Sequence, residues 1–313
     1  MSFYSKSLIP FVALSTFFLA ACGDQGSHAS AGSTQIPDEP GAAIETIARE
    51  LAAGNGGILW QAMPTSYQID VNAIAHLAGS KVDPEVYDKS FGLLGRLIEV
   101  ADQQKEFLLN TKLGGPQPAD QIERFEAAWP SIVGFVQTIT SSAIASSAGL
   151  QSFDGQDFFG TTVSELIQYT EELSSLSDGA LPLSAYKGVT VKNLESNEHT
   201  ATLEMTAPSG EVETEVFTRV DGRWVPADMA TGWESSIAAA KAQLDSMTPE
   251  QVAQSKPQIL QVIGMLDGVI TQIEAAQTQE QFDQALQGAM MPLMGLMMMQ
   301  QGMGGGQSAP VMP

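Results

Sequence analysis

The sequence predicts an α+β fold that is mainly α-helical, with a four-stranded antiparallel meander and flanking helices. Apolar residues repeat with the helical period of 3.6 between residues 42 and 178. From residue 183 the period changes to 2 over four short runs that are separated by turn residues. Capping-box patterns at 248–251 and 278–281 then indicate further helices up to residue 287.

The chain begins with a segment typical of a secretory signal peptide. Lys6 is the only charged residue among the first 21, and residues 8–21 are mainly apolar. A short basic start, an apolar core of about 12 residues and small residues at its end define such a peptide. The apolar run is shorter than the about 20 residues that a membrane span needs.

The only cysteine, Cys22, directly follows Leu19-Ala20-Ala21. This stretch resembles the lipobox of bacterial lipoproteins, over residues 1–24. The resemblance implies that the Cys22 thiol receives a diacylglycerol, that cleavage occurs before it, and that the new amine is acylated, for example with palmitate. Two or three acyl chains anchor a protein stably in a lipid bilayer. In enterobacterial lipoproteins, an aspartate directly after the cysteine favours the inner membrane. With Gly23 at this position, the resemblance implies the outer membrane, with the body facing the periplasm.

Two other interpretations of Cys22 stay open from the residues alone: an ordinary signal peptide that contains a cysteine, or a buried core cysteine. If Cys22 is acylated, the mature chain has no free thiol. Disulfides, zinc fingers, thiol catalysis and iron–sulfur clusters are then excluded.

The chain is strongly acidic, with 14 basic and 36 acidic residues. Cleavage before Cys22 removes one lysine and no acid, which leaves a net charge of −23. Nucleic acid is therefore not an expected partner, because its binding depends on lysines and arginines that neutralise phosphates. An acidic surface that keeps the protein soluble is the simpler explanation, and a basic partner is the alternative.

Residues 22–41 are small and polar and predict a flexible tether. One helix is expected from residue 42 to the glycine-rich stretch 54–57, and a second from residue 65 to Gly79. A third is expected from Asp83, as N-cap, to residue 110. The apolar stripe expected on the last of these helices consists of Tyr87, Phe91, Leu94, Ile98, Ala101, Lys105 and Leu108.

The next helix begins near residue 118 and is expected to break at Trp129-Pro130. It resumes over 131–150, which carry no charge and predict a helix buried inside a bundle. Thr162 and Glu165 then match a capping box for a helix that ends near residue 178.

The strands are expected over 185–195, 199–207, 211–220 and 223–228, with helix 232–247 packed against them. Alternation places one set of residues on the buried face: Ala201, Leu203, Met205, Ala207, Val212, Val216 and Val220. Glu211, Glu213 and Glu215 are then assigned to a solvated face. After the strands, a short lead-in from Thr248 precedes a helix that starts at Pro257, and a last helix starts near residue 279.

Two longer-range resemblances accompany the strands. The segment VDGRWVP at 220–226 resembles the last strands of nuclear-transport-factor-two-like lipoproteins. The pairing of LPLSAYKGVTV…VDGRWVPADMATGW with WQAMPTSYQIDV…DPEVYDKSFGLLG resembles a family of uncharacterised bacterial lipoproteins, and this resemblance implies no activity.

Catalytic signatures are not recognisable. His28, His76 and His199 have no acid or hydroxyl at a nucleophile spacing, and phosphate-binding and zinc-protease motifs are absent from the sequence. Asp154 and Asp157 resemble the start of a calcium loop but lack its later ligands.

The segment 288–313 is rich in methionine and glycine, and seven of the fourteen methionines lie between 290 and 303. Met291, Met294 and Met298 would share one face of a helix. Thioethers bind Cu(I), so these three residues are candidate metal ligands. The same spacing also gives an adaptable apolar surface for a partner, for a membrane or for the bundle itself.

The leading hypothesis is a lipid-anchored periplasmic envelope protein that acts as a non-enzymatic structural or interaction module. The alternatives are a Cu(I)-handling protein that uses the tail methionines and, third, an envelope enzyme with an unrecognised site. The expected partners are the lipid bilayer, through acylated Cys22, and an envelope protein. The segments are a lipoprotein signal peptide (1–21), a tether (22–41), an α-helical domain (42–178), the meander with C-terminal helices (183–287) and the tail (288–313).

Overall fold

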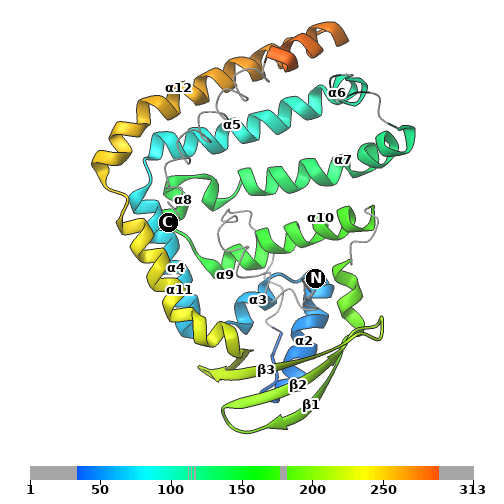
Figure 1. Cartoon of the computed structure of the whole chain (residues 1–313), viewed down its shortest axis with the longest axis vertical. Helices are drawn as coiled ribbons and strands as arrows, with labels where there is room; N and C mark the ends of the chain where they lie inside the picture. The colour runs from blue at the N-terminus through cyan, green and yellow to red at the C-terminus, as the bar shows by residue number, and fades with distance from the viewer. Residues whose placement is uncertain (1–33, 112, 114, 116–117, 177–181, 289–313) are drawn as a thin grey trace, which may run out of the picture.

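The computed structural model describes residues 34–111, 113, 115, 118–176 and 182–288. It confirms the α+β prediction, since helices predominate and one antiparallel sheet has the strand order β1-β2-β3-β4 (Figure 1). The strands are β1 (Thr190–Ser196), β2 (Thr200–Thr206), β3 (Val212–Val220) and β4 (Arg223–Pro226).

The helices follow the predicted order with different ends. They are α2 (Pro40–Ala52), α3 (Gly57–Ala62), α4 (Thr65–Lys81), α5 (Pro84–Gln103), α6 (Lys105–Asn110), α7 (Ala119–Thr140), α8 (Ser147–Gln151), α9 (Gly155–Phe158), α10 (Ser164–Ser175), α11 (Ala227–Asp245) and α12 (Pro249–Glu274). Short helical turns are η1 (Ala143–Ala145), η2 (Phe159–Val163) and η3 (Leu183–Gly188), and residues 279–288 are also helical.

The buried face of β3 differs from the prediction. On β2, Ala201, Leu203 and Met205 are buried as expected, but Val212 and Val216 are 55% and 46% exposed. The register pairs Ala201 with Phe217, which is fully buried. Because strand residues alternate between faces, an aromatic side chain in the core turns the valines outward.

The sheet and the N-terminal helices share one core. The same hydrophobic cluster contains Ile44 and Ile47 of α2, Ile58 of α3, and Leu203 and Phe217 of the sheet. The predicted boundary between 178 and 183 therefore separates two patterns of sequence but not two cores.

The described end of the predicted tether packs against the body. Ile36 is buried, and the carbonyl of Asp38 accepts a hydrogen bond from the Trp224 indole at 2.8 Å. The Glu39 carboxylate caps α2 by accepting from the backbone of Gly41 and Ala42. Residues 34–41 are thus part of the folded body, and the remainder of the predicted tether lies outside the described residues.

Helix α11 begins at the sheet and then runs beside α4 (Figure 1). Tyr67 of α4 stacks on Trp233 of α11 with 3.9 Å between ring centroids, and Trp233 donates to Asp70 at 3.1 Å. Lys81 and Asp245 form an ion pair of 2.8 Å at the other ends of the two helices. The predicted helix–sheet contact therefore involves only the first turns of α11.

Four helices, α12, α5, α7 and α10, lie side by side in one layer (Figure 1). Arg96 of α5 binds Asp267 and Glu274 of α12, the latter at 2.6 Å. Gly134 brings α7 close to α10, since a Cβ at this position would lie 2.3 Å from the Tyr169 ring. The layer is built from contacts between successive neighbours.

Both prolines expected to break or start helices lie inside continuous helices. Pro130 is in α7 and Pro257 is in α12, so the predicted interruption at 129–130 and the predicted start at 257 are wrong. Each proline removes the donor to the carbonyl four residues earlier. Those residues, Glu126 and Ala253, are exposed, so water can satisfy the freed carbonyls.

The uncharged stretch 131–150 is not one helix. Helix α7 ends at Thr140, where the hydroxyl of Ser141 donates to the carbonyl of Gln137 at 2.6 Å and competes with helix continuation. A new helix starts after Ser146, whose side chain accepts from the Gly149 N–H.

Three other helix ends also differ. Gly79 does not end α4; it lies inside the helix, where a Cβ would be 2.7 Å from the Gln151 backbone nitrogen of α8. Thr162 is buried in a π-turn that continues into α10, so the cap of this helical run is Asp154. A break at Gln104 divides the predicted helix 83–110 into α5 and α6.

Candidate functional site

Helix α5 has three sides with different surroundings. Leu93, Arg96 and Val100 face α12, whereas Ile98 and Asp102 face α7. A helix turns about 100° per residue. Positions 94, 97 and 101 therefore lie together between these two contact sides, and all three are apolar: Leu94, Leu97 and Ala101.

Helix α7 is divided in the same way. Trp129 and Val133 pack towards α5, while Ser131 donates to Glu172 of α10 at 2.6 Å. The side of α7 between these contacts carries apolar residues: Phe125, Ile132 and Val136. The opposite side carries polar residues and a proline: Glu123, Glu126, Pro130 and Gln137.

The apolar sides of α5 and α7 meet on one face of the layer. Ala101 and Val136 pack against the same buried cluster, which contains Ile98 and Trp129. The residues of this surface, which we call the apolar face, are Leu94, Leu97, Ala101, Phe125, Ile132 and Val136.

Solvent reaches the apolar face. Leu94 is 39% exposed, Leu97 44% and Phe125 39%. Single exposed apolar residues are normal on a protein surface, but here three large ones lie on the same face of two adjacent helices. Such patches are typical of binding surfaces.

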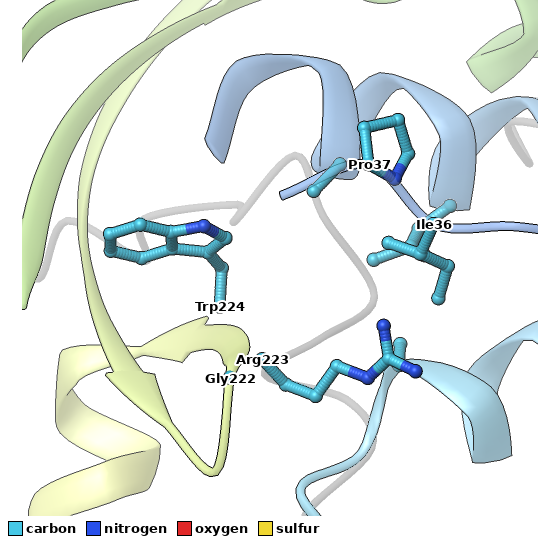
Figure 2. Close-up of a pocket in the computed structure, with 8 residues that line it drawn as sticks. Ile36, Pro37, Gly222, Arg223 and Trp224 are labelled. Atoms are coloured by element: carbon cyan, nitrogen blue, oxygen red, sulfur yellow. The ribbon is translucent and has the colours of Figure 1, made fainter. Parts of the chain in front are cut away.

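The two best-formed cavities of the described residues are smaller than most small-molecule binding sites. One of about 10 Å³ lies between the segment before α2 and β4, where Ile36 and Pro37 face Arg223 and Trp224 (Figure 2). This volume holds about one water molecule. A shallower hollow of about 270 Å³ beside Leu51 and Ile167 is just below the usual size of small-molecule sites.

Among the polar residues singled out in the sequence, His76 and Asp154 make contacts within the fold. His76 Nε2 is 2.9 Å from the Phe153 carbonyl oxygen, and His199 is exposed at a hairpin. Asp154 caps α9 by accepting from Gln156 and Asp157. Within the described residues, no cluster of three or more histidines or acids could hold a metal ion.

The acidic strand β3 departs from its predicted solvated placement. Glu215 pairs with the fully buried Leu203 and lies on the inner side of the sheet. Burial is the main cause that raises the pKa of Glu215, the charges of Glu213 and Asp228 add to it, and together they bring the pKa to about 7. Near neutral pH, Glu215 is therefore only partly ionised.

The remaining predicted site residues lie outside the described residues. These are Cys22, the lipidation candidate, and Met291, Met294 and Met298, the copper candidates. In the described ranges between 34 and 288, no helix has both the length and the apolarity of a membrane span.

Sequence reasoning missed the apolar face because it assigned Leu94 to a buried stripe together with Ile98. The available signal was the width of the apolar sector: α5 has apolar residues at 93, 94, 97, 98, 100 and 101. A helix with two neighbours in one layer leaves part of such a sector uncovered. Comparison with known protein families, with curated proteins and with solved structures finds no match to this chain.

Proposed function

We propose that this protein is a lipid-anchored component of a bacterial cell envelope that acts as a non-enzymatic interaction module. The observation that carries the interaction role is the apolar face, with Leu94, Leu97 and Phe125 exposed on adjacent helices. Its proposed partner is another protein of the envelope.

The anchor is the second part of the proposal, and the lipobox resemblance at Cys22 supports it. In this proposal the acylated protein faces the periplasm from the outer membrane. The described body begins by residue 34, so about 12 residues would separate it from the lipid, with a root-mean-square reach of about 20 Å. A tether of this length lets the folded body stand off the membrane.

Cys22→Ala tests the anchor. We expect the wild type to incorporate labelled palmitate and to fractionate with membranes, and the variant to do neither. A variant that stays membrane-bound, together with a wild type that takes up no palmitate, would contradict the anchor.

Leu97→Asp tests the interaction role. A charge at this exposed position should disfavour burial in an interface without affecting the core. We expect chemical crosslinking in cells to give a discrete envelope complex with the wild type and little of it with Leu97→Asp. Gln103→Asp, which adds the same charge on the opposite side of α5, is the matched control and should retain the complex.

Copper handling by Met291, Met294 and Met298 is the second candidate, favoured by their thioether chemistry and spacing. A Cu(I) competition titration of the mature chain with and without residues 288–313 tests it. Equal affinities would exclude these methionines as the copper site.

A further inference from the structure

The exposed side chains of the apolar face suggest that another segment or protein covers it. One edge of this face lies near the last described helix. Residues 279–288 pack against α5 and α12 through Phe282 and Ala285, in the same cluster as Val100. Gln279 donates to the Phe107 carbonyl at 3.0 Å, and the rings of Phe107 and Phe282 are 5.8 Å apart. Residue 288 lies six residues after Phe282, so the chain beyond it starts about 9 Å along the helix axis from this contact.

This starting point is continuous with the apolar face. Leu108 of α6 packs against the cluster that contains Phe282 and also against the cluster that contains Ile98 and Trp129. Ala101, a member of the apolar face, packs against the second cluster. An apolar path thus leads from the last described helix to the apolar face.

The segment that follows has the composition expected for such a surface. Residues 289–313 contain no charged residue, although the whole chain has a net charge of −22. Seven methionines and two leucines lie between 290 and 303. Methionine side chains are flexible and adapt to irregular apolar surfaces, and their burial removes apolar area from water.

The length of this segment is sufficient. From Leu108 back to Leu94 the layer measures about 21 Å at the helical rise of 1.5 Å per residue. Residues 289–303 cover about 22 Å as a helix and about 50 Å when extended. A covalently attached segment also has an effective concentration of about millimolar, which favours it over separate partners.

We infer that residues 289–303 dock on the apolar face of the same chain. This inference rests on the proposed function, because it names the first occupant of the same surface. A partner that binds the apolar face competes with residues 289–303 for the same surface.

Methionine oxidation measures this docking directly. The mature chain, residues 22–313 with Cys22→Ser, is treated with hydrogen peroxide without detergent, and the oxidation of each methionine is followed by mass spectrometry. We expect Met291, Met294 and Met298 to oxidise about ten-fold more slowly than Met312, which corresponds to about 1.4 kcal/mol of docking free energy.

Two kinds of variant distinguish docking from other causes of protection. Leu97→Asp should bring the oxidation of Met294 to the rate of Met312, whereas Gln103→Asp should leave the protection unchanged. Met298→Gln changes only the tail, so it leaves the folded body intact, and it should speed the oxidation of Met294.

Equal oxidation rates for Met294 and Met312 in the wild type would overturn the inference. Protection that increases with protein concentration would also overturn it, because the occupant would then be a second copy of the chain. Either result leaves the proposed function standing if the envelope complex still depends on Leu97. If Met294 is not protected and the envelope complex does not depend on Leu97, both the docking and the proposed interaction role of the apolar face are contradicted.

Discussion

Glu215 shows how strand register decides the chemistry of a single residue. Its sequence neighbours suggest a solvated acidic strand, but pairing with Leu203 brings its carboxyl onto the inner side of the sheet. Burial is the main cause of its raised pKa, followed by the charges of Glu213 and Asp228. The raised pKa depends on which face of β3 is buried. Phe217 lies in the core, and Glu215, two residues earlier, lies on the same face.

The raised pKa makes stability depend on pH. The folded chain titrates Glu215 near 7, whereas the unfolded chain titrates it near the ordinary value of 4.5. Between these values the folded chain binds more protons, so the free energy of unfolding falls as the pH rises through this window. Below pH 4.5 this contribution is fully present, and above pH 7 it is lost.

Glu215→Gln should remove most of the decrease in the free energy of unfolding between pH 4.5 and pH 7, because the amide stays neutral at every pH. Since Glu215 is only half buried, solvent screening limits the expected gain above neutral pH to on the order of 1 kcal/mol. Urea unfolding from about pH 4.5 to about pH 8 measures it. Glu195→Gln, at an exposed strand position, should keep the wild-type slope; a parallel slope in Glu215→Gln would contradict the account.

At the scale of elements, two predicted caps mark helix starts correctly, whereas two predicted proline boundaries do not. Thr248 and Gln251 form the predicted capping box at α12, and Asp83 caps α5 as predicted. The sequence predicts helix boundaries at Pro130 and Pro257, yet both prolines lie on exposed surfaces of continuous helices. A proline inside a helix loses one hydrogen bond and crowds the carbonyl four residues earlier, and exposure of that carbonyl to water lowers the cost.

Asp154→Ala tests the cap that the sequence did not identify. Asp154 accepts from Gln156 and Asp157 and starts the helical run that leads into α10. We expect its loss to lower the free energy of unfolding by about 1 kcal/mol in urea denaturation. Asp157→Ala is the matched control and should cost only a few tenths of a kcal/mol. Equal effects would show that Asp154 does not act as the cap.

At the scale of the whole molecule, the sequence predicted the fold class and the four-stranded meander, because both depend on local periodicity. Asp221 and Gly222, between β3 and β4, are the residue types that a two-residue hairpin turn favours, and both adopt its positive φ angles. The arrangement of α5 and α7 in one open layer was not readable. It depends on contacts between helices far apart in sequence, such as Arg96 with Glu274.

The apolar face is the proposed contact surface of this protein, for residues 289–303 and for an envelope partner. The most direct measurement places the photo-crosslinking residue p-benzoylphenylalanine at position 97 in cells and, as a control, at position 103. We expect crosslinks from position 97 to residues 289–303 of the same chain or to one envelope protein, and none of these products from position 103. Equal products from both positions, or no product from position 97, would contradict it.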